Sequence, residues 1–196
     1  MTRGFAVLAA AVVFLAGASH ARAQGFLFDS RDIMGGGPNF FSHGGASPIP
    51  RTSVIYPTNY APGTIVINTA ERRLYLIEPG GQALRYGIGV GRDGFRWGGV
   101  HRISAKKEWP GWTPPAEMRR RRPDLPGHMA GGIDNPLGAR AMYLGSTLYR
   151  IHGSNEPETI GQAVSSGCFR MTNDDVIDLY ERVSVGTPVL VIDEKH

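Results

Sequence analysis

The sequence is almost devoid of cysteine: Cys168 is the only one in 196 residues. A single thiol excludes an intramolecular disulfide, so this chain does not have the framework of bridges that holds many small secreted domains together. An unpaired cysteine forms an intermolecular bridge, lies inert in a core, or reacts. The residues around Cys168 therefore have to distinguish among these three possibilities.

The chain also lacks an apolar run long enough for a membrane-spanning helix, which takes about 20 residues. The apolar run 5–16 follows the cation of Arg3 and precedes an A-R-A triplet at 21–23. This order predicts a signal peptide over residues 1–23, export to the periplasm or cell envelope, and no membrane span after cleavage. The alternative is an uncleaved N-terminal anchor. No cysteine follows the run at the cleavage site, which excludes a lipoprotein anchor there.

Charged residues make up 19% of the chain and hydrophobic residues 41%, as in ordinary globular proteins. The length suits one domain with a core better than two. The 27 glycines and 14 prolines favour many short elements joined by tight turns, and so a mainly β fold. A net charge of +4 makes acidic polymers candidate partners, but it does not choose among cell-wall glycopeptide, phospholipid and nucleic acid.

The chain divides by composition into a linker and a domain. Residues 24–61 are rich in glycine and proline without a sustained period, which predicts a linker. In residues 62–196, the segments TIVIN, RRLYLIE and GQALRYGIGVG predict a β-meander, and AMYLG, TLYRIH and PVLVI predict further strands. Between these groups, residues 105–140 are too rich in proline and glycine for a long element. A loop of this size is typically a lid or a binding loop.

Two helices are expected near the C-terminus. The segment GSNEPETIGQAVSS is long enough for a short helix at about 159–164. Thr172 followed by Asp175 is a capping pattern, and it predicts the start of a second helix. The apolar residues that would share one face of that helix are Val176, Leu179, Tyr180 and Val183.

Residues 89–94 match the pattern G-x-G-x-x-G, which in dinucleotide-binding proteins precedes a helix. Here FRWGGVHRIS follows, with further glycines and no helical period, so we expect a hairpin turn and no nucleotide cofactor. Histidines, carboxylates and the thiol do not occur at metal-ligand spacing, so we expect no metal.

The segment RIHGSNEPETIGQAVSSGCFRM, 150–171, holds the residues with chemical potential. A thiol becomes a nucleophile when its thiolate is stabilised and a base lies within reach. His152 ends a predicted strand, and the Gly153 carbonyl can fix the tautomer of its ring. The connection that follows is long enough to bring Cys168 back beside His152.

Small residues around Cys168 extend this site. The backbone amides of Ser166, Gly167 and Cys168 can hold the oxyanion that forms when a thiolate attacks a carbonyl. Arg170 is expected on the same side of an extended segment as Cys168, where it can bind a carboxylate. Each residue has a structural alternative: a buried thiol, a hydrogen-bonded histidine, and an Arg170 that pairs only with Asp174 or Asp175.

The pattern I-H-G-S-N-x-P-x-x-I-G-x-x-V-S-S-G-C-F-R-M closely resembles the signature of L,D-transpeptidases with a YkuD-type catalytic domain. EWPGWTPPAEM, GGIDNPLGARAMYLG and GTPVLV are also similar to that family, and the resemblance covers about residues 62–193. It implies a mainly β fold, a YkuD-like β-sandwich of mixed sheets with a few short helices. Residues 62–196 are accordingly expected to be the catalytic domain.

By this resemblance Cys168 is the nucleophile and His152 the general base. Gly153 orients His152, and Ser166 and Gly167 contribute to the oxyanion hole. The segment 109–126 corresponds to a loop that covers the substrate cleft. The residues expected to bind substrate are Arg170, Asn155, Trp109 and Trp112.

The sequence departs from the family pattern at two places. Ser166 stands where many members have histidine, although a backbone role there does not depend on the side chain. The turn at 95–99 lacks the Thr-Pro-x-Gly often found after the early strands.

The implied substrate is a peptidoglycan tetrapeptide stem, whose terminal D-alanine leaves before the acyl group passes to an amine of a neighbouring stem and forms a 3-3 cross-link. Carbapenems are implied to acylate Cys168. Water, a D-amino acid or a lysine of an envelope protein remain alternative acceptors, and a non-catalytic peptidoglycan-binding domain is an alternative of another class. Export and the absence of a recognisable binding motif argue against nucleic acid. The run 119–122 of arginines is either solvated charge or a contact for an acidic polymer.

Overall fold

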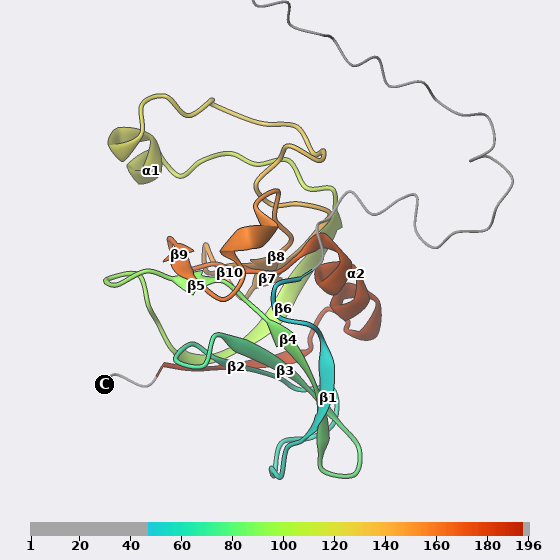
Figure 1. The fold of residues 1–196 in the computed structure, drawn as a ribbon. Helices are drawn as coiled ribbons and strands as arrows, with labels where there is room; N and C mark the ends of the chain where they lie inside the picture. The colour runs from blue at the N-terminus through green and yellow to red at the C-terminus, as the bar shows by residue number, and fades with distance from the viewer. Residues whose placement is uncertain (1–46, 194–196) are drawn as a thin grey trace, which may run out of the picture. The chain divides into compact units, whose positions relative to one another are not determined.

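The computed structural model describes residues 47–193 and is drawn in Figure 1. The predicted signal peptide, 1–23, and the first part of the predicted linker, 24–46, lie outside the described residues. Within the described range, no helix is long and apolar enough to cross a membrane.

In residues 47–193, short strands outnumber helices, which confirms the mainly β prediction. One sheet of nine strands has the order β1-β4-β3-β2-β11-β6-β7-β8-β10, and β5 pairs separately with β9. The strands are β1 (Thr52–Ile55), β2 (Ile65–Asn68), β3 (Arg73–Glu78), β4 (Gln82–Gly87), β5 (Val90–Gly91), β6 (Gly99–Glu108), β7 (Arg140–Leu144), β8 (Arg150–His152), β9 (Ala163–Ser165), β10 (Phe169–Arg170) and β11 (Pro188–Ile192). The helices are α1 (Ala116–Arg121), the single 3-10 turn η2 (Pro157–Thr159) and α2 (Asn173–Arg182).

The long strand β6 joins the two halves of the large sheet. It pairs with β11 near its start and with β7 further along, and its register shifts between Ile103 and Ala105. Such an irregularity bends a strand and increases its twist. The sheet contains parallel pairs, β2 with β11 and β8 with β10, among antiparallel ones. The predicted sandwich of mixed strands is thus one sheet that curls over itself.

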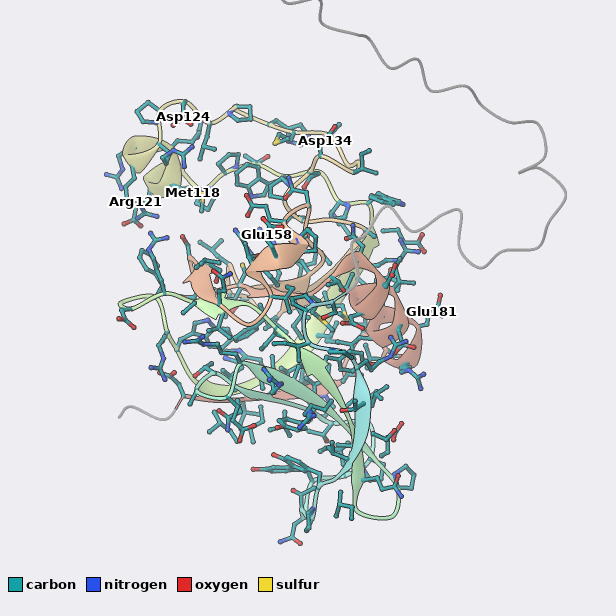
Figure 2. The ribbon with its side chains drawn as sticks, in the orientation of Figure 1. Met118, Arg121, Asp124, Asp134, Glu158 and Glu181 are labelled. Carbon is teal, nitrogen blue, oxygen red and sulfur yellow. The ribbon has the colours of Figure 1, made fainter. Side chains whose placement is uncertain are left out.

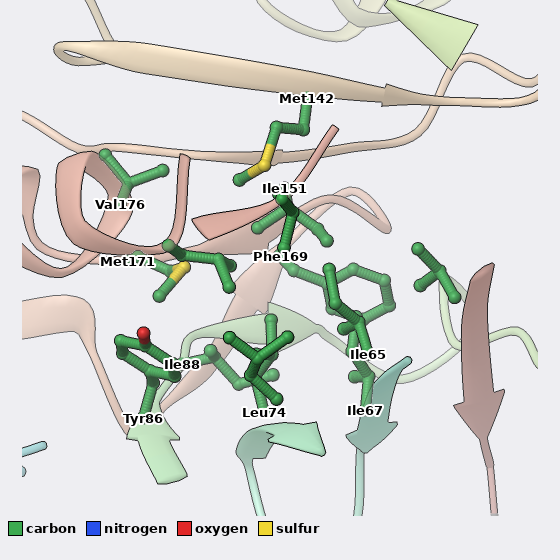
Figure 3. Packing of buried hydrophobic residues seen from close by; sticks show 14 of the residues in the cluster. Ile65, Ile67, Leu74, Tyr86, Ile88, Met142, Ile151, Phe169, Met171 and Val176 are labelled. Carbon is green, nitrogen blue, oxygen red and sulfur yellow. The ribbon is translucent and has the colours of Figure 1, made fainter. Parts of the chain in front are cut away.

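The core lies between the two halves of this curled sheet (Figure 3). Alternate residues of the predicted meander point into it, such as Ile65 and Ile67 of β2, because side chains of a strand alternate between its faces. Met142, Ile151 and Phe169 approach from the other half. β-branched and aromatic residues suit this position because they fill the space over a pleated surface.

Helix α2 begins where the sequence predicts it. Thr172 precedes the helix, and its hydroxyl accepts a hydrogen bond from the Asp175 backbone N–H at 3.3 Å. Val176 and Leu179 are fully buried, and the helix packs against β7. The capping pattern and the apolar face are both confirmed.

The end of the predicted linker is a strand. Residues 52–55 form β1, which pairs antiparallel with β4 at the edge of the sheet. Ile49 lies so close to Gly87 and Gly161 that a Cβ at either glycine would overlap its side chain. The linker boundary at residue 61 is therefore a correction: the ordered domain includes residues 47–61. Composition could not reveal a pairing that depends on β4, far along the chain.

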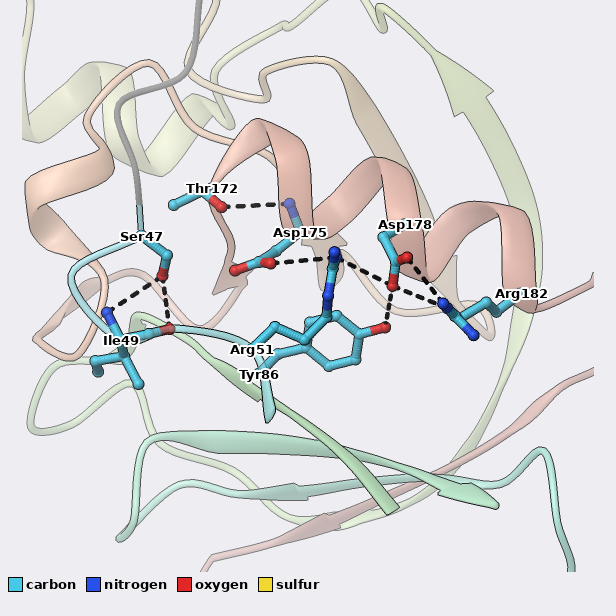
Figure 4. A network of polar contacts seen from close by, with 8 residues as sticks. All are labelled: Ser47, Ile49, Arg51, Tyr86, Thr172, Asp175, Asp178 and Arg182. Carbon is cyan, nitrogen blue, oxygen red and sulfur yellow. Dashed lines mark hydrogen bonds and ion pairs between the residues drawn. The ribbon is translucent and has the colours of Figure 1, made fainter. Parts of the chain in front are cut away.

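A polar network fastens the same segment to α2 (Figure 4). The Arg51 guanidinium lies 3.4 Å from an Asp175 carboxylate oxygen and 3.1 Å from an Asp178 oxygen. The Tyr86 hydroxyl donates to Asp178 at 2.6 Å, and Arg182 pairs with the same carboxylate at 2.9 Å. Arg51, which lies outside the family-like stretch 62–193, thus contributes two ion pairs to the helix that follows Cys168.

The predicted helix at 159–164 is a second correction. One 3-10 turn covers Pro157–Thr159, and Ala163–Ser165 forms β9 instead. Gly161 between them has φ +88°, a left-handed conformation that interrupts a helix. β9 then pairs in parallel with β5.

The G-x-G-x-x-G segment forms β5 and a turn, not the start of a helix. The Phe95 N–H donates to the Arg92 carbonyl at 2.9 Å, and Gly94 has φ +80°. The predicted turn is confirmed, but it is not a hairpin, because β5 pairs with β9 while β6 pairs with β11 and β7.

Candidate active site

The parallel pair of β8 and β10 brings the predicted site residues together. Phe169 lies opposite Ile151 and Arg170 opposite His152. Ile151 and Phe169 point into the core, so His152 and Arg170 project from the other face. Continuing the register by one residue places Cys168 opposite Arg150, also on that outer face.

This face forms the floor of a cleft of about 720 Å³. Cys168, His152 and Arg170 line it from below. The predicted covering loop, 109–126, lines it from above with residues that include Trp112, Met118 and Leu125, and Met129 follows just beyond this loop. Figure 2 shows Met118 and Arg121 on α1, within this loop. The long proline-rich segment is therefore a cover for the cleft, as predicted.

His152 is buried, with 4% of its surface exposed. Its Nδ1 lies 2.6 Å from the Gly153 carbonyl oxygen. A carbonyl only accepts, so Nδ1 carries the proton and Nε2 keeps its lone pair. Burial and, after it, the charges of Arg170 and Arg150 lower the pKa of His152 to about 3, although the hydrogen bond to Gly153 opposes this shift. The ring is therefore neutral at physiological pH and able to accept a proton.

Gly153 has a steric reason to be glycine. A Cβ there would overlap the Asn173 side-chain oxygen, which accepts a hydrogen bond from the Ala139 N–H at 2.9 Å. The Gly153 N–H donates to the Arg140 carbonyl at 3.0 Å. The carbonyl that orients His152 is thus itself held in place. Asn173, the first residue of α2, carries no local signal in the sequence for this role.

Cys168 is half-buried, and its sulfur lies 3.9 Å from the Leu148 carbonyl oxygen. Burial raises the pKa of the Cys168 thiol, and the charges of Arg150 and then Arg170 oppose this rise. The resting thiol is consequently protonated at neutral pH. Its activation requires a base, and His152 is the neutral histidine of the same cleft.

A polar clamp shapes the turn before Cys168. The Ser165 hydroxyl donates to the Cys168 carbonyl at 2.6 Å and accepts from the Gly167 N–H at 3.1 Å. The Trp97 indole N–H donates to the Gly167 carbonyl at 2.8 Å. Because the Gly167 amide is engaged, Ser166 and Cys168 are left as the predicted oxyanion donors. Sequence reasoning missed Ser165 and Trp97, since neither position forms a recognisable spacing with Cys168.

Arg170 pairs with a residue that the sequence did not suggest. Its guanidinium lies 2.7 Å from a Glu156 carboxylate oxygen and 3.4 Å from the Thr159 hydroxyl. The expected alternative partner Asp175 pairs with Arg51 instead. Arg170 remains a lining residue of the cleft, as a carboxylate-binding group has to be.

The other predicted contact residues divide into two groups. Asn155 and Trp112 line the cleft, and the Asn155 amide donates to the Asp134 carbonyl at 3.0 Å. Trp109 does not line it: its side chain is 43% exposed, and its N–H donates to the Ala139 carbonyl at 2.8 Å. The structure therefore brings Trp112 to the cleft and leaves Trp109 outside.

The arginine run 119–122 is also divided. All four arginines are exposed, but only Arg121 and Arg122 line the cleft. Arg122 pairs with Asp124 through two hydrogen bonds of 2.9 and 2.6 Å. Arg121 lies over the Phe95 ring, 5.2 Å from its centroid, on the opposite wall of the cleft. The whole run is thus solvent-exposed, and its second half also lines the cleft.

The cleft holds a protonated thiol, a neutral and oriented histidine, and several cations. This combination can support nucleophilic catalysis by a cysteine. The match to known proteins is more specific. The chain belongs to the YkuD family of L,D-transpeptidase catalytic domains, whose model matches residues 62–191.

Curated relatives in Escherichia coli (strain K12) carry the same family name. The chain is 42% identical over 139 residues to the probable L,D-transpeptidase ErfK/SrfK and 44% identical over 139 residues to the probable L,D-transpeptidase YbiS. Each match covers 66% of this chain and 44% of the relative. The chain thus matches less than half the length of these relatives.

Solved structures share the fold. L,D-transpeptidase 3 from Mycobacterium tuberculosis has a TM-score of 0.53 at 15% identity, covering 66% of this chain and 60% of that one. A structure from Brucella melitensis named as a probable carnitine operon oxidoreductase has a TM-score of 0.50 at 50% identity, covering 73% of this chain and 93% of that one.

The oxidoreductase name is that of the Brucella structure and is not carried over to this chain. The G-x-G-x-x-G segment does not open a helix and so lacks the phosphate-binding geometry of a dinucleotide site. Among residues 47–193, no group of three or more His, Cys, Asp or Glu side chains is placed to hold a metal ion.

Proposed function

We propose that this protein is a peptidoglycan L,D-transpeptidase that acts through a Cys168 acyl-enzyme. The observation that carries the proposal is the shared face of β8 and β10, on which Cys168 lies next to His152 at the floor of a covered cleft. The orientation of the His152 ring by the Gly153 carbonyl supports its role as the base.

The proposed reaction has two halves. His152 Nε2 takes the proton of the Cys168 thiol, and the thiolate attacks the carbonyl of the third residue of a tetrapeptide stem. The amides of Ser166 and Cys168 hold the oxyanion, and the terminal D-alanine leaves with the proton from His152. An amine of a neighbouring stem then attacks the thioester, His152 takes its proton, and the thiol regains a proton as the 3-3 cross-link forms.

Arg170, Asn155 and Trp112 are the proposed contacts to the substrate. The Arg170 guanidinium can exchange its ion-pair partner without moving. A substrate carboxylate can replace the Glu156 carboxylate, because both groups accept hydrogen bonds from the same guanidinium N–H donors. The apolar side chains of the cover, Met118 and Met129, suit the uncharged parts of a peptide.

The proposal places the reaction outside the cytoplasm. The predicted signal peptide, 1–23, supports export to the periplasm, where stem peptides are available. The Cys168 thiolate would also attack the β-lactam carbonyl of a carbapenem, opening the ring and leaving Cys168 acylated. A lysine of an envelope protein is a further candidate acceptor for the stem-peptide acyl group.

The test is incubation of the purified protein with a disaccharide-tetrapeptide, followed by protein mass and muropeptide analysis, with Cys168→Ala as control. An adduct on Cys168 together with a 3-3 dimer is the expected result. An adduct that yields only tripeptide assigns water as the acceptor, and added D-amino acids or a lysine-bearing protein then identify exchange or tethering. Full cross-linking by Cys168→Ala overturns the proposal.

A further inference from the structure

We propose that Arg150, which lies beside Cys168 on the outer face of β8, is the cation that stabilises the Cys168 thiolate. The inference rests on the proposed function in one respect, because it concerns the nucleophile of that reaction. It adds a residue that neither the sequence analysis nor the motif around Cys168 assigns.

The first support is the register of the sheet. Because Phe169 lies opposite Ile151 in the parallel pair, Cys168 comes opposite Arg150, with both side chains on the face away from the core. The Cys168 sulfur accordingly lies close to the chain that enters β8, 3.9 Å from the Leu148 carbonyl oxygen. Arg150 and Cys168 line the same cleft.

The second support comes from the ion pairs that the arginines lining the cleft form with carboxylates. Arg170 pairs with Glu156, Arg121 with Glu117, and Arg122 with Asp124. Within the part of the chain that the structure describes, Arg150 and Arg92 are the lining arginines with no carboxylate in ion-pair contact, and Arg92 lies over the Phe95 ring, 4.4 Å from its centroid. The Arg150 Nε atom is buried without a hydrogen-bond partner. A half-buried cation without a carboxylate partner, next to a thiol, supplies the charge that a thiolate needs.

The third support is that Arg150 and Arg170 influence the pKa values of Cys168 and His152 to different degrees. After burial, which raises the pKa of Cys168, the charge of Arg150 is the largest influence in the opposite direction, ahead of Arg170. For His152 the order is reversed, and Arg170 acts more strongly than Arg150. Arg150 therefore acts mainly on the nucleophile, and Arg170 mainly on the base and the substrate.

Other charged side chains also line the cleft and contribute to the electrostatic potential at the Cys168 thiol. Besides Cys168, the titratable and charged side chains that line it are Arg92, Glu117, Arg121, Arg122, Asp134, Tyr149, Arg150, His152, Glu156 and Arg170. Arg150 also has a structural alternative, because its guanidinium lies over the Tyr143 ring, 5.3 Å from the centroid. A test has to separate the charge of Arg150 from its packing.

The experiment compares Arg150→Met, which keeps an unbranched apolar stem on Tyr143, with Arg150→Lys, which restores a cation. The rate of Cys168 alkylation by iodoacetamide is followed by protein mass from pH 5 to 10. We expect the pH profile of Arg150→Met to shift to higher pH by about one unit, which lowers the thiolate fraction at neutral pH about tenfold. Arg150→Lys is expected to stay close to the wild-type profile.

Arg73→Met is the matched control, since Arg73 lies in β3 and its guanidinium donates to the Glu71 carbonyl. Its profile is expected to superimpose on the wild type. If Arg150→Met superimposes as well, the proposal is wrong. Arg150→Gln replaces Arg150→Met if thermal unfolding shows that the latter is not folded. Alkylation requires no peptidoglycan, so a shifted profile in a protein without cross-linking activity would contradict the proposed function and leave the role of Arg150 standing.

Discussion

The Trp97 indole N–H donates a hydrogen bond to the Gly167 carbonyl oxygen at 2.8 Å, and the Trp97 ring stacks on Tyr149 with centroids 4.4 Å apart. Gly167 has φ +107°, and a Cβ there would overlap the Tyr149 ring. The residue before the nucleophile is therefore held from both sides. The position of the Cys168 sulfur depends on aromatic residues that take no part in the chemistry.

Gly167→Ala adds only one methyl group, but we expect it to disturb the turn before Cys168 strongly. The methyl group meets Tyr149, and the left-handed conformation costs a non-glycine residue about 1–3 kcal/mol. We expect a loss of unfolding free energy of that order and a strong loss of acyl-enzyme formation. Urea unfolding and protein mass after carbapenem treatment measure the two effects. Wild-type acylation by Gly167→Ala would show that the turn does not position Cys168.

Ser165→Ala should reduce activity although Ser165 is not expected to touch the substrate. The variant removes the acceptor of the Gly167 N–H and the donor to the Cys168 carbonyl, and each buried group left unpaired costs about 1–3 kcal/mol. We expect kcat to fall at least tenfold with little change in KM, since the turn moves and the binding contacts do not.

Ser166→Ala is the matched control for this prediction, because Ser166 is expected to act only through its backbone. Steady-state cross-linking kinetics of both variants provide the comparison. Equal losses in Ser165→Ala and Ser166→Ala would contradict the separate role of the Ser165 hydroxyl.

The contacts of Trp97, Tyr149 and Ser165 with the turn before Cys168 could not be predicted from the sequence, whereas other parts of the fold could. The meander of β2 to β4 and the helix α2 were predictable because their signals are local: alternation in RRLYLIE, and a cap at Thr172. The family resemblance and a chemical argument both predicted Cys168 and His152 as site residues, and both line the same cleft.

The parts that were missed depend on contacts distant in sequence. Residues 52–55 form β1 because they pair with β4 at the edge of the sheet. Residues 163–165 form β9 because they pair with β5. Arg150 resembles any arginine in a strand until the parallel pairing with β10 sets it opposite Cys168. Pairing of this kind is set by tertiary packing, which local propensity does not contain.

The burial of His152 predicts a characteristic pH dependence of stability. Its pKa of about 3 in the folded protein lies below the ordinary value of 6.5, so the unfolded chain binds more protons between these values. The free energy of unfolding therefore falls as the pH drops from 6.5 toward 3, with a slope of up to about 1.4 kcal/mol per pH unit. In His152→Gln this contribution is absent. Urea unfolding across this range should give a shallower slope for the variant, and equal slopes would contradict the assignment.

Arg51 should stabilise the domain from outside the family-matched region. Arg51→Met removes the cation beside Asp175, whose Oδ2 is buried without a hydrogen-bond partner. Because Arg51 is partly solvent-exposed, we expect a loss of about 1 kcal/mol at neutral pH. Burial raises the pKa of Asp175, so its protonation at lower pH should recover part of this loss. The double variant Arg51→Met/Asp175→Asn should be more stable at pH 7 than Arg51→Met alone, as measured by thermal unfolding. If it is less stable, the ion pair is not the reason for the effect.

The contact between Phe95 and the cover of the cleft should control access to Cys168. The Phe95 ring has the Arg92 guanidinium 4.4 Å from its centroid and the Arg121 guanidinium of α1 at 5.2 Å. An exposed cation–π contact is worth about 0.5–1 kcal/mol, so Phe95→Leu should favour opening of the cover by a factor of about 2–5. Trypsin cleavage within residues 119–122 should accelerate by this factor, and KM for the stem peptide should rise with it. Arg92→Met removes one cation from the same ring but leaves Arg121 in place, so it should have a smaller effect on cleavage. Equal cleavage rates in Phe95→Leu and wild type would show that the cover is held by its other contacts.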